Sequence, residues 1–120
     1  VDARNEQNMI PVSTLPLPPM EDFKKRGGRF GSHNLYENKP DDVSFHSDTI
    51  IFGTFFSGGV RGYDTSNPLQ PKEIASFVPE APKGGRATSI QFNDVHIDEK
   101  GLVYTVDRHS GGLYILECDM

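Results

Sequence analysis

The sequence has little of what would assign a chain to a familiar class at once. Its single cysteine, Cys118, excludes an internal disulfide and leaves the redox compartment open. No apolar run approaches the roughly 18 residues that a transmembrane helix needs. Lysine and arginine number 12 against 17 aspartate and glutamate residues. The resulting formal net charge of -5 argues against a general binder of nucleic acid or of anionic membranes.

The beginning of the chain also lacks an initiator methionine and a signal-like apolar stretch. It starts at Val1, as a processed or excised product would, although an arbitrary boundary explains this start equally well. We therefore expect a soluble chain that is either cytoplasmic or exported after processing.

Turn-forming residues are plentiful. The 120 residues include 12 glycines and nine prolines. Hydrophobic content is low at 35%, yet aromatic and β-branched residues are common, which argues against wholesale disorder. The length suffices for one small domain with one modest core. The composition predicts a turn-rich, all-β chain.

The sequence contains an internal repeat, which shows as short markers that recur in the same order. Ser57-Gly58-Gly59 recurs as Ser110-Gly111-Gly112, and Asp42-Val43 recurs as Asp94-Val95. The offsets are 53 and 52 residues for these two markers and 57 and 62 for the two markers further upstream, which predicts longer loops in the first copy. Further upstream, two more segments match: Arg26-Gly27-Gly28-Arg29 with Lys83-Gly84-Gly85-Arg86, and residues 12–15 with residues 74–77.

Each copy is expected to fold into antiparallel strands, because alternating apolar runs are separated by Gly, Asn-Pro and Ser-Gly-Gly turns. With strands lettered a to d from the inside of a repeat outward, the chain reads d, a-b-c-d, a-b-c. The predicted strands are residues 9–15, then 42–48, 49–56, 60–64 and 72–78, then 94–98, 102–107 and 113–117.

Four antiparallel strands per repeat suggest the blades of a β-propeller. A complete propeller has about 4–8 blades, and this chain supplies strands for about two. We therefore expect a β-propeller fragment, completed by another polypeptide or by self-association. Its parts would be an orphan outer strand with a connector (1–41), a complete blade (42–82) and an incomplete blade (83–120). The alternative is a small two-sheet sandwich made from the same strands.

Three stretches resemble the LVIVD-repeat β-propeller family. "DDVSFHSDTIIFGTFFSGGVRGYDTSNPLQPKEIASFVPE" looks like one repeat, and "NDVHIDEKGLVYTVDRHSGGLYILE" is similar to the last repeat of such bacterial proteins. "RGGRFGSHNLYENKP" is like a connector of longer members. The resemblance covers residues 11–117 and implies the C-terminal portion of a longer bacterial propeller. It implies a fold but little chemistry, because fold does not determine function.

Histidines are the best candidates for a metal or catalytic site. His33 and Asn34 precede a predicted inner strand, and inner strands of a propeller line its central channel. A ring of His, Asn and Asp from several blades can bind a divalent metal at the propeller axis. Asp94 and His96 share one face of the second inner strand. The alternative is that these side chains only satisfy turns and strands, and His46 and His109 are expected in exposed loops.

A second candidate is the basic segment "FKKRGGRFG", in which Arg26 and Arg29 flank two glycines. Gly-rich backbone and guanidinium groups can hold a phosphate or carboxylate. The segment lacks the Gly-Lys-Ser/Thr ending of a phosphate-binding loop. Its partial recurrence as "KGGR" favours a structural connector. Ser57 and Ser110 lack the Gly-x-Ser-x-Gly frame of a hydrolase elbow, so we interpret both as turn residues.

Two functions are consistent with these observations. The first is a binding or assembly module, because the repeat is incomplete and no full catalytic motif is present. The second is the small chain of a heteromeric propeller enzyme, a hydrolase, a lyase or a metal-dependent oxidoreductase. Its channel site would include His33, with Asn34, Asp94 and His96 as further candidates.

Overall fold

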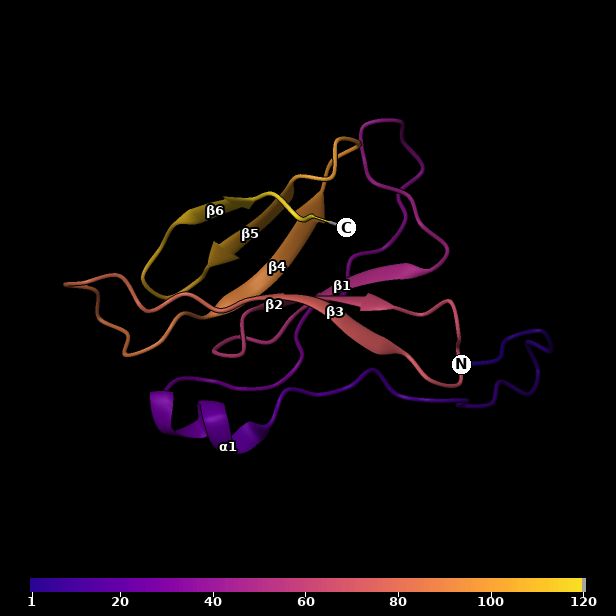
Figure 1. Ribbon diagram of the computed structural model, residues 1–120, viewed down its shortest axis with the longest axis horizontal. Coiled ribbons are helices and arrows are strands. Elements are labelled where there is room, and N and C mark those ends of the chain that lie inside the picture. The colour runs from indigo at the N-terminus through magenta and orange to yellow at the C-terminus, as the bar shows by residue number, and fades with distance from the viewer. Residues whose placement is uncertain (120) are drawn as a thin grey trace.

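The computed structural model describes residues 1–119 as two antiparallel three-stranded sheets, preceded by a long N-terminal segment with two short helical turns (Figure 1). The all-β prediction is confirmed, but the two sheets do not close into a ring. None of the helices in residues 1–119 is long and apolar enough to cross a membrane. The elements are α1 (Met20–Phe23), η1 (Lys24–Arg26), β1 (Ile50–Thr54), β2 (Val60–Asp64), β3 (Lys72–Phe77), β4 (Phe92–Ile97), β5 (Val103–Asp107) and β6 (Leu113–Leu116). The first sheet has the strand order β1-β2-β3, and the second has the order β4-β5-β6.

Both Ser-Gly-Gly segments form the predicted hairpin turns, one between β1 and β2 and the other between β5 and β6. The turn between β1 and β2 lies close to β3 and leaves no room for a side chain at Gly59. Gly59 has φ of 80°, and a Cβ atom there would clash with the carbonyl oxygen of Phe77 on β3. Glycine is needed because it alone accepts this backbone conformation without a side chain in the way.

The first sheet gains a fourth, irregular strand from residues 33–36, which run antiparallel to β1. The Tyr36 N–H donates to the Phe52 carbonyl at 2.8 Å, and the Thr54 N–H donates to the Asn34 carbonyl at 2.9 Å. The expectation that residues 42–48 form this inner strand is therefore wrong. Those residues make an isolated bridge from Ser44 to Asp98, beyond the end of β4.

Burial explains why residues 33–36, and not residues 42–48, lie beside β1. Tyr36 is buried, and its hydroxyl donates toward the carbonyls of Phe45 at 2.8 Å and Ile97 at 3.1 Å. By contrast, Val43 of the repeated Asp-Val marker is 64% exposed and packs into no sheet. The repeated Asp-Val marker therefore led to the wrong prediction of the inner strand, since an apolar side chain stabilises such a strand only when it is buried.

The predicted first strand, residues 9–15, is also not formed. Ile10 bridges back to Asp2 in a local loop, and the Ser13 hydroxyl donates to the carbonyl of Pro68. Pro11, together with the prolines that follow residue 15, removes backbone donors that a strand ladder needs. The segment therefore forms no strand ladder beyond the single bridge between Asp2 and Ile10.

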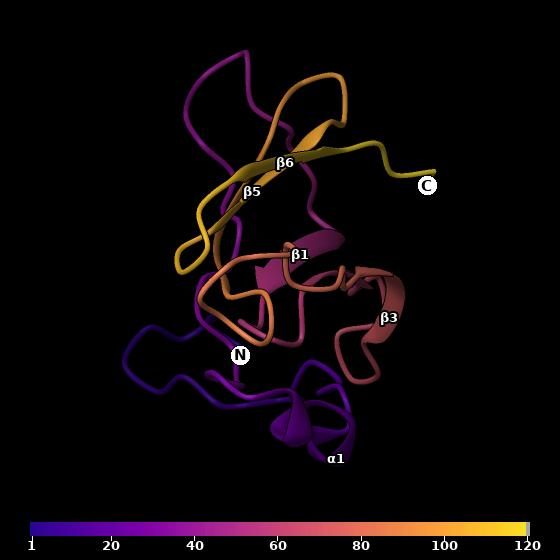
Figure 2. The same ribbon diagram turned by 90° about the vertical axis from the view of Figure 1, so that its left-hand side faces the viewer.

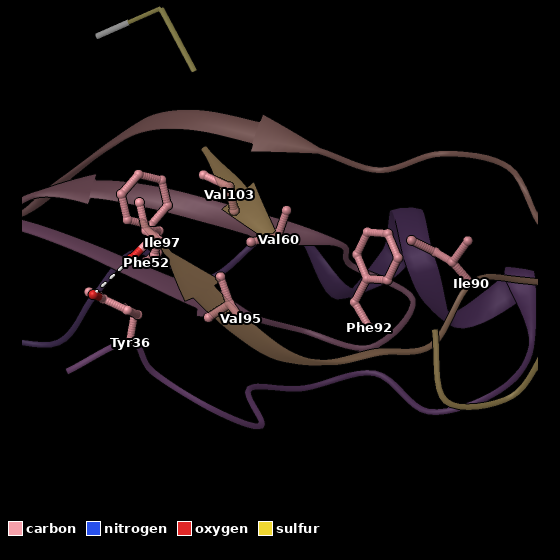
Figure 3. Close-up of a cluster of buried hydrophobic side chains, with 8 residues drawn as sticks. All are labelled: Tyr36, Phe52, Val60, Ile90, Phe92, Val95, Ile97 and Val103. Atoms are coloured by element: carbon pink, nitrogen blue, oxygen red, sulfur yellow. Dashed lines mark hydrogen bonds between the residues drawn. The ribbon is translucent and has the colours of Figure 1, made fainter. Parts of the chain in front are cut away.

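The core lies between the two sheets, where side chains from both point toward one another (Figure 3). Phe92 at the start of β4 is fully buried. Its ring centroid lies 6.3 Å from that of Phe77 and 4.9 Å from that of Tyr114. It therefore touches both sheets. The buried apolar cluster consists of Tyr36, Phe52, Val60, Ile90, Phe92, Val95, Ile97 and Val103.

The opposite face of the first sheet is covered by the N-terminal segment. Phe23 of α1 stacks on Phe30 with ring centroids 5.5 Å apart, and the Arg61 guanidinium from β2 lies 5.4 Å from the Phe23 ring. In both views α1 lies on the side of the first sheet away from β5 and β6 (Figures 1 and 2). The order of layers is therefore N-terminal segment, first sheet, second sheet.

Candidate functional site

The start of β4 brings together three of the residues predicted to form a site. The His33 ring nitrogen Nδ1 lies 2.6 Å from the carbonyl oxygen of Asn93, and the Asn34 amide nitrogen donates to Asp94 Oδ1 at 3.1 Å. Both contacts join residues 33–36 to β4. His33, Asn34 and Asp94 thus meet where the two inner strands run side by side.

The contact of His33 decides its tautomer. A carbonyl oxygen only accepts hydrogen bonds, so Nδ1 of His33 must carry the hydrogen. In the neutral ring this makes Nε2 the nitrogen with a free lone pair. The side chain is exposed and is therefore accessible to a ligand.

His96 lies apart from this group. Its Nδ1 is 3.1 Å from the ammonium nitrogen of Lys39, and its ring centroid is 6.0 Å from those of Tyr36 and Tyr104. Within residues 1–119, no three His, Cys, Asp or Glu side chains lie close enough together to hold a metal ion. A metal at His33 or His96 would thus need ligands from outside this chain.

The basic segment separates into two clusters. Arg26 stacks on Phe23 with its guanidinium carbon 4.9 Å from the ring centroid. Arg29 instead lies over Phe56 at 5.8 Å, and Arg108 approaches the same ring at 5.9 Å. The two arginines predicted to share a ligand are thus stacked on different rings.

His33 completes the second cluster with an edge contact to the Phe56 ring, at a centroid distance of 4.8 Å. We call the group of Arg29, His33, Phe56 and Arg108 the Phe56 site. Arg108 and Phe56 were not identified from the sequence. The signal available was that both lie within two residues of a Ser-Gly-Gly turn, since these turns lie at equivalent ends of the two hairpins.

The backbone under this site is strained and firmly held. Phe56 has φ of 49°, a left-handed conformation that is uncommon for a bulky residue. Its N–H donates to the Phe92 carbonyl at 2.9 Å, and the Phe92 N–H donates back at 3.3 Å. Strain of this kind persists only where the surroundings enforce it, and it is concentrated at functional sites.

The two serines of the turns have no histidine partner in the part of the chain that the structure describes. Ser57 is buried and Ser110 half-buried, and neither hydroxyl makes a hydrogen bond within residues 1–119. This arrangement fits their interpretation as turn residues. His46 and His109 are both exposed, as predicted.

A groove of about 450 Å³ opens between the outer strands β3 and β6. Apolar residues line much of it, including Ala75, Phe77, Leu116 and Cys118. Burial, and secondarily the Asp119 carboxylate, raise the pKa of the Cys118 thiol. Because the thiolate is the nucleophile, this shift argues against an activated cysteine.

The outer face of the second sheet is open to solvent over β6 and partly apolar, whereas its β4 side is contacted by Asn34 and Lys39. Leu113 and Ile115 on β6 are 59% and 57% exposed, and Val106 beside them on β5 is 38% exposed. The strand register places six side chains on what we call the outer face: Asp94, His96, Tyr104, Val106, Leu113 and Ile115.

The repeat relates this outer face to a buried one. Val106 pairs with Leu113 as Thr54 pairs with Val60, each being the last pair before a Ser-Gly-Gly turn. By the same register Tyr104 corresponds to Phe52, which is 2% exposed. The outer face is thus the counterpart of the face that the first sheet buries against the second.

Comparison with protein-family models, with curated proteins and with solved structures finds no match to this chain. Membership of the LVIVD-repeat family therefore remains a prediction from the residues quoted above.

Proposed function

We propose that the chain is a binding and assembly module of the β-propeller type, in which another polypeptide places a further antiparallel sheet on the outer face. The carrying observation is the repeat relation just described. One copy of this face is buried against the neighbouring sheet, and the second copy is open to solvent with Leu113 and Ile115 exposed. A further sheet that packed on the second sheet as the second packs on the first would cover the outer face.

The composition of the outer face supports an interface. Val106, Leu113 and Ile115 form an apolar group, while Asp94 and His96 lie along the other side of the face, on β4. An exposed apolar group with polar residues beside it is compatible with a specific protein interface, which combines a buried apolar part with a polar rim.

We favour another polypeptide over a second copy of this chain for a steric reason. The face suited to the outer face is the one that β4, β5 and β6 turn toward the first sheet, carrying Val95 and Val103. In this chain that face is buried, and the matching face of the first sheet is covered by Phe23. A second copy therefore has no free face of this type to offer.

The experiment is photo-cross-linking in the cells in which the chain naturally occurs. Benzoylphenylalanine at Leu113 is expected to give a covalent adduct with one other polypeptide, through a peptide in which apolar and polar residues alternate. The same probe at Leu69, an exposed leucine in the loop after β2, is the matched control and should give none. The substitution Ile115→Lys should remove the adduct and leave the melting temperature unchanged, because that side chain is exposed.

Three outcomes would contradict the proposal: an adduct only with a second copy, equal adducts from Leu113 and Leu69, or none from either.

The alternative is a small chain of a heteromeric, metal-dependent propeller enzyme. The observation that favours it is the fixed tautomer of His33, whose free Nε2 lone pair is the form that ligates metals. Asp94, which the neighbouring Asn34 amide contacts, would be a further candidate ligand, and the partner would supply the remaining ones. Metal analysis of the intact assembly would then show a stoichiometric divalent ion that His33→Ala abolishes, and a metal-free assembly would exclude this function.

A further inference from the structure

We infer that the Phe56 site binds an oxyanion, the carboxylate or phosphate group of a small molecule. The site lies on residues that the proposed interface does not use, so the two proposals stand or fall separately. Three segments far apart in the sequence converge here: Arg29 before the inner strand, Phe56 at the first hairpin turn and Arg108 at the second.

The two guanidinium groups lack carboxylate partners. Within residues 1–119, the arginine ion pairs are Arg4 with Asp2 and Arg61 with Glu73, so neither Arg29 nor Arg108 is neutralised. The chain carries more acidic than basic residues, yet it places two unpaired arginines on one ring. This concentration of positive charge favours an anionic ligand.

Neighbouring carboxylates are held by other groups. Asp94 accepts from the Asn34 amide and from the Val95 N–H at 2.9 Å. Asp107 Oδ1 accepts the N–H groups of His109 and Ser110 at 2.9 and 3.3 Å. These hydrogen bonds engage Oδ1 of each carboxylate, while Oδ2 of Asp107 has no hydrogen-bond partner within residues 1–119. Neither carboxylate forms an ion pair with Arg29 or Arg108 in that part of the chain.

The site is built on a buried support, the side chain and backbone of Gln91. This residue is 2% exposed. Its side-chain oxygen Oε1 accepts the backbone N–H of Arg29 at 2.8 Å, and its backbone carbonyl accepts the backbone N–H of Arg108 at 3.2 Å. Gly28 presses so closely on the Gln91 amide that a side chain there would clash. One buried glutamine thus fixes the backbone beneath both arginines.

The contact with Phe56 leaves the arginines able to bind a ligand, because Arg29 and Arg108 place their guanidinium carbons 5.8 and 5.9 Å from the ring centroid. A guanidinium in cation–π contact with a ring can still donate hydrogen bonds from the N–H groups that point away from the ring. Paired N–H donors match the two oxygens of a carboxylate or phosphate. The left-handed conformation of Phe56 positions its ring to receive both guanidinium groups and the edge of His33.

The test is a titration of the full chain with sodium phosphate and, in a second arm, with sodium acetate, at constant ionic strength set by chloride. The readout is the NMR signal of the arginine Nε–H groups. We expect saturable shifts at Arg29 and Arg108 with at least one anion, with a Kd on the order of 1 mM. The arm that saturates at lower concentration identifies the preferred group.

Substitutions make the test specific. Arg29→Gln and Arg108→Gln should each weaken binding by about tenfold, since each removes a charged paired donor. Arg86→Gln is the matched control, because Arg86 is the exposed counterpart of Arg29 in the repeat and contacts no aromatic ring in residues 1–119. Arg29→Lys keeps the charge but not the paired donors and should recover only part of the affinity.

Absence of saturation with both anions would overturn the inference. Equal weakening by Arg86→Gln would overturn it as well, because a general charge effect would then explain the binding.

Discussion

Tyr63 on β2 is fully buried, yet its hydroxyl has no hydrogen-bond partner within residues 1–119. Burial, with a smaller effect of the Glu73 carboxylate, raises the pKa of this phenol to about 12. Leaving a buried hydroxyl unsatisfied costs about 1–3 kcal/mol. The residue is thus held in place by its ring, which packs 6.3 Å from that of Phe55, and not by its polar group.

We expect Tyr63→Phe to raise the free energy of unfolding at pH 7 by about 1 kcal/mol, measured by urea denaturation. The wild-type chain should lose stability as the pH rises from about 10 to about 12, because the unfolded phenol ionises there while the folded one stays protonated. The variant should lose that part of the alkaline destabilisation.

The control is Tyr104→Phe, since the Tyr104 hydroxyl donates to Asp98 at 3.0 Å. That substitution should lower the free energy of unfolding, because the hydrogen bond to Asp98 is lost. If both variants were destabilised alike, Tyr63 would have a partner that the structure does not show.

The sequence could predict part of the candidate site at this scale. His33 and Asn34 were identified because they precede residues 42–48, the segment predicted as the inner strand. The structure places them within the inner segment 33–36 itself, at the start of β4, where Asn34 contacts Asp94. Arg108 and Phe56 could not be found in this way. Their contact depends on which ends of two hairpins meet, and no local pattern encodes that.

At the scale of the elements, the turns are the most strongly determined parts of the fold. Gly59 and Gly101 have nearly the same φ, 80° and 82°, but different surroundings. A Cβ atom at Gly59 would overlap the backbone of Phe77 on β3, whereas nothing lies within 4 Å of one at Gly101. Substitutions at Gly59 and Gly101 therefore separate the cost of backbone strain from the cost of steric overlap.

Gly101→Ala should cost about 1 kcal/mol, the penalty of a left-handed conformation for a residue with a side chain. Gly59→Ala should cost clearly more, on the order of 3 kcal/mol, because β3 must also move away from β2. Thermal unfolding of both variants measures the difference. Equal costs would mean that β3 shifts freely.

The sequence predicted every strand that has a regular ladder, because alternation and turn chemistry are local properties. It failed at residues 42–48 and 9–15. In the first case the repeated Asp-Val marker outweighed the burial of Tyr36, which depends on tertiary contacts. In the second, the prolines at and beyond residue 11 should have excluded a paired strand.

For the whole molecule, Phe92 joins the two sheets more directly than any turn does. Its ring touches Phe77 of the first sheet and Tyr114 of the second, and its backbone bonds Phe56 in both directions. A fully buried phenylalanine that contacts both sheets should make their unfolding cooperative. The sequence predicted two related sheets, which the structure has, and the closed ring of a β-propeller remains a prediction.

We expect Phe92→Ala to cost about 3–5 kcal/mol and to lower the unfolding midpoint of both sheets together. NMR signals from Val60 and Ile115, one in each sheet, should disappear at the same urea concentration. Val43→Ala is the control and should change the stability by no more than about 0.5 kcal/mol, because that side chain is exposed. Survival of the Val60 signal after loss of the Ile115 signal would show independent sheets.

Both ends of strand β4 are hydrogen-bonded to earlier parts of the chain. At its first residue, Phe92 exchanges two backbone hydrogen bonds with Phe56, and at its last residue the carbonyl of Ile97 accepts the Phe45 N–H at 3.0 Å. Attachment at two points restricts the movement of the second sheet relative to the first. We therefore expect binding at the Phe56 site to reduce backbone fluctuation and to slow amide exchange around Phe56 and Phe92, and not to bring the two sheets closer together.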